Sequence, residues 1–217
     1  MRVEKTATDK KLEKIIVPYR IGLQEKLAED VVYSGFPLEK GLPESELTNV
    51  IADAVFQTAK NWSIENQQAL PDMCMLNMGG IRTALPVGML NVGHMYEVMP
   101  FENEIVLLRL TPDNVRALAD YISEKGGSPV AGIRLRIDGS KAHNVELNGA
   151  PFLYDRDIWV ATSDFLAFGG DGMVFFDKPL AFIETKIKVR DAITAYFKSF
   201  RTAGKSLGAV KDGRIYK

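Results

Sequence analysis

The chain has 217 residues, 46% hydrophobic and 25% charged, so it is long enough to bury a core in one large domain or two small ones. Its 27 basic and 28 acidic residues leave a formal net charge of -1, which gives no reason to expect a nucleic-acid polymer as partner. No apolar run approaches the roughly 18 residues of a transmembrane helix, and the single cysteine, Cys74, excludes an internal disulfide.

The first part of the chain carries two helical patterns separated by a short strand. Apolar residues at spacings of three and four predict an amphipathic helix over residues 9–28, which Pro18 should kink or split. The run Val31-Val32-Tyr33 is a strand candidate. Ser45 is placed to cap the next helix, whose apolar stripe extends over residues 47–55.

The middle of the chain alternates strands with a helix. The unbroken apolar run 73–76 predicts a short buried strand, and residues 95–101 form a further strand candidate. Residues 104–110 are apolar enough for a central strand. Thr111 and Pro112 suit the cap and the first position of a following helix.

The last part of the chain adds strands and a closing helix. Strict alternation over 133–137 predicts a half-buried strand with Arg134 and Arg136 on its wet face. Residues 158–162 are another strand, and residues 185–200 form an amphipathic helix. Interspersed helices and strands predict a mixed α/β (α+β) fold in which helices cover the sheets.

The domain organisation expected from these patterns is simple. No long repeat and no low-complexity tract interrupts the chain. We therefore expect a single domain over residues 1–217, with an N-terminal helix at 9–28, a core at 30–200 and a C-terminal tail at 201–217.

Residue types that commonly carry catalysis are scarce. His94 and His143 lie in unrelated contexts, and neither has neighbours at metal-ligand spacing. No nucleophile elbow, zinc-protease motif or phosphate-binding P-loop is present. Cys74 sits in an apolar run, where inert packing is the better interpretation. These observations favour a binding protein over a catalyst and assign no metal or catalytic residue to this chain.

A glycine pair follows the predicted strand at 73–76. Asn77 ends the strand, and Gly79 and Gly80 let the backbone approach a ligand closely. Arg82 then presents a charged, planar fork that suits a phosphate or carboxylate. The segment therefore resembles an anion-binding loop. The alternative from these residues alone is a surface turn with a solvated arginine.

A second glycine-rich loop carries an acid. Asp171 lies in the run Gly169-Gly170-Asp171-Gly172, and a carboxylate on such a turn can accept hydrogen bonds from two neighbouring hydroxyls of a ribose. The alternative is that Asp171 only stabilises its own turn. Phe101 and Phe165, if brought together, could stack on both faces of a purine or pyrimidine, whereas each alone suits a core.

Three segments together resemble a known family. The runs Asn77-Met-Gly-Gly-Ile-Arg82, Met99-Pro-Phe-Glu-Asn103 and Asp164-Phe-Leu-Ala-Phe-Gly-Gly-Asp-Gly172 occur in the order and at the spacing of the C-terminal domain of 5'-nucleotidases. The similarity extends over nearly the whole chain. It implies a layered α/β/β/α fold and a role as the nucleotide-specificity half of a two-domain enzyme.

The resemblance also implies roles for particular residues. Phe101 and Phe165 would sandwich the base, Asn103 would reach the base edge, and Asp171 would hold the ribose hydroxyls.

The phosphate end of the site is expected on the first loop. Asn77 and Gly79 would line the pocket beside the base or phosphate, and Arg82 would bind the phosphate. The family usually places another arginine before its opening helix, but residues 38–45 contain none, and Lys40 is the only candidate replacement.

The metallophosphatase half of the family, with its metal ligands, is absent from this sequence. We therefore expect a stand-alone substrate-binding chain of a split 5'-nucleotidase, with divalent metals held by a separate metallophosphatase partner. The alternative is a nucleotide- or nucleoside-binding protein with no hydrolytic role. Resemblance alone suggests the periplasm or cell envelope, although the sequence begins without a signal segment.

Overall fold

A five-stranded sheet separates the two buried cores of the molecule. The computed structural model describes residues 10–217. The sheet has the order β10-β4-β9-β2-β5, in which only the pair β2 and β9 is parallel. Its strands are β2 (Met73–Met75), β4 (Glu104–Leu110), β5 (Val130–Ala131), β9 (Ile158–Ser163) and β10 (Ala181–Lys188).

The strand β4 shows why a continuous apolar run was needed here. Successive side chains of a strand point to opposite faces. Ile105 and Leu107 belong to one buried core, whereas Val106 and Leu108 belong to a second core on the other face. Because both faces are covered over residues 105–108, the side chains of both alternate sets are apolar there.

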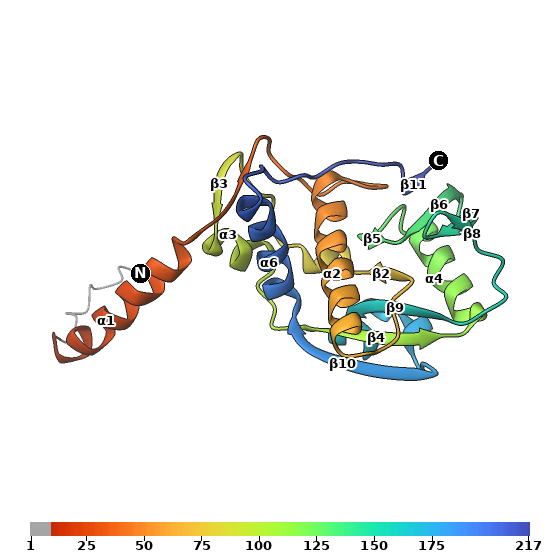
Figure 1. Ribbon diagram of the computed structural model, residues 1–217, viewed down its shortest axis with the longest axis horizontal. Coiled ribbons are helices and arrows are strands. Elements are labelled where there is room, and N and C mark those ends of the chain that lie inside the picture. Colours follow the sequence, from red (N-terminus) through yellow and green to blue (C-terminus); the bar gives the residue numbers. More distant parts are fainter. Residues whose placement is uncertain (1–9) are drawn as a thin grey trace, which may run out of the picture.

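Helices and a small sheet cover the first face. α2 (Glu46–Glu65) and α6 (Val189–Thr202) stand side by side against the central sheet (Figure 1). α3 (Val92–Val98) and the antiparallel pair β1 (Asp30–Ser34) and β3 (Gly88–Asn91) extend this core. The predicted cap is confirmed, because the Ser45 hydroxyl accepts a hydrogen bond from the Thr48 backbone and the Thr48 hydroxyl accepts from the Ser45 backbone.

A second sheet and α4 (Pro112–Glu124) form the core on the other face. The sheet has the order β11-β6-β7-β8, with strands β6 (Ile133–Asp138), β7 (Lys141–Leu147), β8 (Ala150–Pro151) and β11 (Ile215–Tyr216). Thr111 caps α4 and Pro112 opens it, as predicted. Two sheets between covering helices give the mixed α/β fold that the sequence predicted.

Three corrections concern single elements. Residues 92–98 form α3 and not the predicted strand over 95–101, because Asn91 and His94 make a reciprocal cap that starts a helix. Residues 185–188 end strand β10, so the last helix starts at Val189 and not at 185. The C-terminal segment 201–217 is more than a tail, since Ile215 pairs in parallel with Leu135 of β6.

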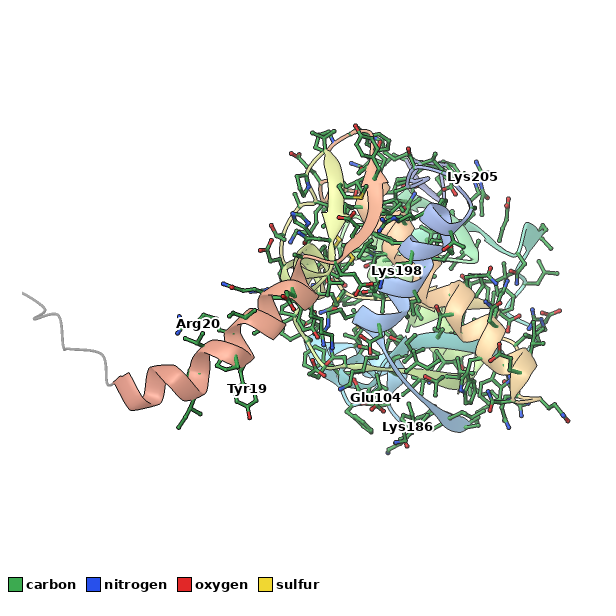
Figure 2. All side chains as sticks on the ribbon, turned by 60° about the vertical axis from the view of Figure 1, so that its left-hand side comes forward. Tyr19, Arg20, Glu104, Lys186, Lys198 and Lys205 are labelled. Atoms are coloured by element: carbon green, nitrogen blue, oxygen red, sulfur yellow. The ribbon has the colours of Figure 1, made fainter. Side chains whose placement is uncertain are left out.

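The N-terminal helix α1 (Lys10–Leu27) projects from the body, and Tyr19 and Arg20 stand clear of it (Figure 2). Residue 9 of the predicted helix lies outside the described residues. Of the predicted kink or split at Pro18, the split is wrong, because α1 runs unbroken through this residue. On a projecting helix, water can bond the carbonyl that loses its donor. No helix within residues 10–217 is long and apolar enough to cross a membrane.

Candidate functional site

The topology of the central sheet brings three chain segments to one edge. Because β2 and β9 are parallel neighbours, the segments that follow them emerge side by side. These are the turn η1 (Met78–Gly80) after β2, and α5 (Asp164–Ala167) with η2 (Gly170–Gly172) after β9. β4 runs antiparallel to β9, with Ile105 opposite Ser163, so the residues just before β4 reach the same edge.

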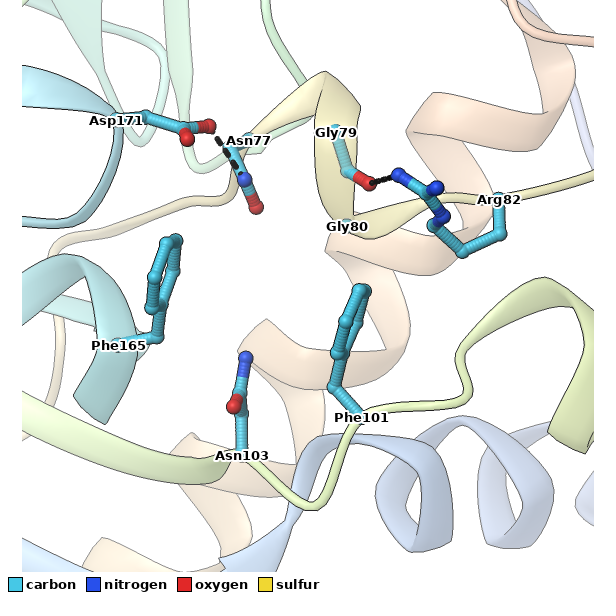
Figure 3. Close-up of a pocket in the computed structure, with 8 residues that line it drawn as sticks. All are labelled: Asn77, Gly79, Gly80, Arg82, Phe101, Asn103, Phe165 and Asp171. Atoms are coloured by element: carbon cyan, nitrogen blue, oxygen red, sulfur yellow. Dashed lines mark hydrogen bonds between the residues drawn. The ribbon is translucent and has the colours of Figure 1, made fainter.

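A cavity of about 210 Å³ opens at this edge (Figure 3). It is lined by Asn77, Gly79, Gly80, Arg82, Phe101, Asn103, Phe165 and Asp171. The seven residues to which the family resemblance gave a place in the pocket (Asn77, Gly79, Arg82, Phe101, Asn103, Phe165 and Asp171) are therefore in one place, although they come from segments up to 94 positions apart. Gly80, the second glycine of the pair that follows the strand, also lines the cavity. Whether these residues bind a nucleotide stays a prediction.

Phe101 and Phe165 form two walls of the cavity. Their side chains face one another across the open space, and the Asn103 amide lies between the backbone ends of these two side chains (Figure 3). Phe101 is 40% exposed and Phe165 is 46% exposed, so neither is the core residue that each would suggest alone. Exposed aromatic rings on opposite sides of a slot suit a flat, aromatic ligand.

The wall that carries Phe101 is held by an arginine that the sequence analysis did not single out. Arg190 is 3% exposed, and its guanidinium donates to the carbonyls of Met99, Pro100 and Phe101 at 3.4, 3.2 and 3.3 Å. It also donates to the carboxylate of Glu102. The only signal in the sequence was an arginine at the start of an amphipathic helix, which does not reveal these distant partners.

The positive charge of this cluster lowers the pKa of Glu102. Hydrogen bonds from Arg190 and then Lys188 hold the pKa of the Glu102 carboxyl at about 2. The segment 99–103 has no regular secondary structure of its own. The Arg190 side chain therefore satisfies backbone carbonyls of this segment that strand pairing would satisfy in a sheet.

The wall that carries Phe165 is held by packing. The Ser163 hydroxyl accepts a hydrogen bond from the Leu166 backbone and caps α5. Gly170 lies directly against the ring, since a Cβ at this position would be 2.5 Å from Cε1 of Phe165. A glycine is needed there because any side chain would push the ring from its place.

Asp171 sits at one end of the cavity on a strained turn. Its φ of 54° lies in the left-handed region, which is uncommon for a residue other than glycine and often marks a functional position. The Asn77 amide donates to one Asp171 carboxylate oxygen at 2.5 Å (Figure 3). Within residues 10–217 the carboxylate makes no hydrogen bond to its own turn, so the simple turn-stabilising interpretation is wrong.

Asn77 connects the two glycine loops. Its side chain does not cap the turn that it precedes. The side-chain amide oxygen of Asn77, Oδ1, lies 2.8 Å from the position that a Cβ on Gly80 would take. The glycine therefore leaves room for Asn77 to reach Asp171, and one oxygen of Asp171 stays open to the cavity.

The cationic residues lie at the rim. Arg82 donates to the Gly79 carbonyl at 3.1 Å and lies 5.9 Å from the centre of the Phe101 ring. It is exposed and lines the cavity. Lys40 donates to the Ile81 carbonyl at 2.9 Å and does not line the cavity. Among the residues that the structure describes, Arg82 is consequently the one cation in the lining.

Two further side chains weighed for chemistry, His94 and Cys74, have structural surroundings. The ring of His94 accepts a hydrogen bond from the Asn91 backbone. Burial raises the pKa of the Cys74 thiol, which keeps it protonated and unreactive. Within residues 10–217, no group of three or more histidine, cysteine or acidic side chains is placed to hold a metal ion.

The chain is thus an α/β domain whose central sheet ends at an aromatic slot, with a carboxylate at one end and a guanidinium at the rim. The family model for the C-terminal domain of 5'-nucleotidases matches residues 26–178. The chain belongs to this family of substrate-binding domains.

Similar curated proteins are longer than this chain. It is 31% identical over 163 residues to the trifunctional nucleotide phosphoesterase protein YfkN of Bacillus subtilis, covering 68% of this chain and 11% of that protein. It is 26% identical over 177 residues to the 5'-nucleotidase of Vibrio cholerae, covering 76% of this chain and 30% of that protein. The chain therefore spans less than a third of the length of these relatives.

Solved structures share the fold. A 5'-nucleotidase precursor from Thermus thermophilus superimposes with a TM-score of 0.76 at 24% identity, over 94% of this chain and 42% of the other. The NAD nucleotidase of Haemophilus influenzae gives a TM-score of 0.70 at 20% identity, over 97% of this chain and 42% of the other. These similarities support the mixed α/β fold expected from the sequence.

Proposed function

We propose that this domain is the nucleotide-binding half of a split 5'-nucleotidase, and that a separate metallophosphatase chain hydrolyses the nucleotide that it holds. The observation that carries the proposal is the pair of facing rings, Phe101 and Phe165, in a cavity that also holds Asp171 and Arg82. A base stacked on such rings gains on the order of 1–3 kcal/mol per contact.

Each polar residue has a part in this proposal. The open oxygen of Asp171 accepts hydrogen bonds from the ribose hydroxyls. The Asn103 amide, which lies at the closed end of the slot between the two phenylalanines, offers a donor and an acceptor to the base edge. Arg82 leaves the Gly79 carbonyl or extends beside it to make charge-assisted hydrogen bonds to the phosphate. The domain supplies position and selectivity, and the chemistry belongs to the partner.

The first test is calorimetric titration of the chain with AMP, adenosine and UMP in the absence of metal. We expect saturable binding that Phe165→Ala weakens roughly tenfold or more, because one stacking face is lost. Phe168→Ala is the matched control, since Phe168 is 76% exposed on the same segment but does not line the cavity. Absence of heat with every ligand would overturn the proposal.

A second test asks whether this chain by itself hydrolyses the nucleotide. The chain alone, with AMP and Mg²⁺ or Mn²⁺, is expected to release no phosphate above the buffer rate. Phosphate release by the purified chain would contradict the assignment of hydrolysis to a separate unit. Location is a further proposal by resemblance, namely the periplasm or cell envelope, and fractionation of the native host checks it.

One observation favours the alternative of a nucleoside-binding protein without a hydrolytic role. Lys40 is engaged with the Ile81 carbonyl, so Arg82 is left to hold a phosphate by itself. The titration separates the two functions. AMP binding about tenfold tighter than adenosine, with the difference lost in Arg82→Gln, supports the nucleotide. Equal affinity for both ligands supports the nucleoside.

A further inference from the structure

The projecting helix α1 presents an apolar stripe that the described part of the chain leaves open to solvent. Ile15, Ile16, Tyr19 and Leu23 are 63%, 46%, 78% and 57% exposed. At about 100° of rotation per residue, these four side chains fall within an arc of about 100° on one side of the helix. An apolar stripe of this kind is suited to burial against a surface outside the domain.

The charge of α1 is opposite in sign to that of the rest of the chain. The helix contains five basic and two acidic residues, whereas the whole chain has a formal net charge of -1. Arg20 borders the apolar stripe, and Lys26 follows on the same side of the helix. Glu25 lies about 120° around the helix from Tyr19. The side of α1 that carries the stripe is therefore basic and complements an anionic surface.

The backbone of α1 is compatible with this use. Pro18 removes the hydrogen-bond donor of the carbonyl of residue 14, and an unpaired carbonyl is costly in an apolar medium. Residue 14 lies about 140° around the helix from Tyr19, so this carbonyl points away from the stripe and towards water.

The root of α1 is fixed to the body. Leu27 packs against the first core, and the Val92 backbone donates to the Glu29 carbonyl at 2.9 Å. The helix stands clear of the body at Tyr19 and Arg20 (Figure 2). The stripe is consequently held by a fixed root and remains accessible to a large surface.

We propose that α1 lies on an anionic lipid surface, with its apolar stripe at the boundary of the acyl chains and its cations at the phosphate groups. Tyr19 suits this boundary because its ring is apolar and its hydroxyl is polar. Lys26 can lay its apolar stem along the stripe while its ammonium reaches a phosphate. The inference goes beyond the proposed function and does not depend on the nucleotide slot.

The charges favour a lipid surface over a second copy of α1. Two copies packed stripe to stripe would bring together two helices of net positive charge. Among residues 15–27, whose side chains the structure describes, Glu25 is the only acid, and it is not beside the stripe. An anionic lipid surface is attracted by the same charges that oppose such a pair.

The experiment is flotation of the full chain with lipid vesicles. One set is phosphatidylcholine, and the other has about one-third of it replaced by phosphatidylglycerol, which supplies a negative surface potential. We expect the chain to bind the anionic vesicles roughly tenfold or more tightly, because each cation near such a surface contributes about fivefold. Raising the salt concentration should reduce this preference.

Two pairs of variants test the stripe and its charge. Leu23→Gln should weaken vesicle binding roughly tenfold, because a buried apolar side chain is lost. Ile21→Gln is the matched control, since Ile21 is 49% exposed but lies about 160° around the helix from both Tyr19 and Leu23. Arg20→Gln should weaken binding about fivefold, whereas Lys205→Gln, on the body, should leave it unchanged (Figure 2).

The outcomes decide the assignment of the stripe. Absence of binding to the anionic vesicles, or an equal loss in Leu23→Gln and Ile21→Gln, would overturn the proposal. Sedimentation velocity without lipid should give a monomer. A dimer that Leu23→Gln dissociates would instead assign the stripe to a second copy of the chain. The two variants should unfold at the same urea concentration, which excludes misfolding as the source of a difference.

Discussion

The two aromatic walls of the cavity are built in opposite ways. Phe101 lies on an irregular segment that a buried guanidinium holds through three carbonyls. Phe165 lies on a capped helical turn, and its ring rests against Gly170. One wall depends on hydrogen bonds to a charged group, and the other depends on steric fit.

This difference teaches how a slot for a flat ligand can be kept open. Facing phenyl rings would gain by burying apolar surface against each other or against the core. Here each ring is restrained at its backbone or its face, so both remain 40–46% exposed. Distinct restraints also predict distinct failures, which variants of each wall can separate.

The largest effect is expected from Arg190→Gln. The variant leaves three carbonyls of the 99–101 segment without their donor and should lower the free energy of unfolding by about 2–4 kcal/mol. Urea unfolding measures this loss. Arg201→Gln, on the same helix, is the control, because Arg201 is exposed and should change stability by no more than about 1 kcal/mol.

Ligand binding tests whether Arg190 positions Phe101 in particular. We expect Arg190→Gln to lower the affinity for AMP and to leave the affinity for ribose 5-phosphate, which has no base, nearly unchanged. Equal loss for both ligands would show that Arg190 only stabilises the fold.

Gly170→Ala should be the next largest perturbation, and it acts on the other wall. The added Cβ would lie 2.5 Å from both the ring and the backbone carbonyl oxygen of Phe165, so Phe165 must shift and adenosine affinity should fall roughly tenfold. Gly172→Ala controls for backbone strain, since its φ is +68° but nothing lies within 4 Å of the added Cβ. Adenosine titration of both variants measures the loss of affinity. An equal loss in the two variants would point to backbone strain and not to displacement of the ring.

Asp171→Asn probes the end of the slot that both walls share. Asparagine tolerates the left-handed backbone at this position, so the fold should be retained. The open carboxylate oxygen is lost, and the preference for AMP over 2'-deoxy-AMP should fall from roughly tenfold towards one. Competition titration with the two nucleotides measures the ratio. An unchanged ratio would remove Asp171 from ribose recognition.

The smallest effect should come from Glu102→Gln on the Phe101 wall. Because folding lowers the pKa of Glu102 from 4.5 to about 2, the ionised carboxylate stabilises the fold above pH 4.5. This stabilisation is lost as the pH falls towards 2. The gap in unfolding free energy between the original chain and the variant should therefore be constant near neutral pH and close in acid. A gap that persists below pH 2 would rule out this ion pair as its source.

Much of the fold followed from local patterns in the sequence. Ser45 and Thr111 predicted helix starts correctly because a cap bonds to a backbone group three residues away. The apolar run 104–110 predicted an interior strand because burial on both faces demands it. Glycine loops, an acid and two phenylalanines, read with the family resemblance, predicted the residues that line the cavity.

What only the tertiary structure decided were the partners across long separations. Asn77 reaches Asp171 94 residues away, and Arg190 reaches the carbonyl of Phe101 89 residues away. Local periodicity and capping carry no information about such pairs, since these depend on which strands are neighbours and in which direction they run. The parallel placement of β2 beside β9 is the physical reason that two distant glycine loops meet in one site.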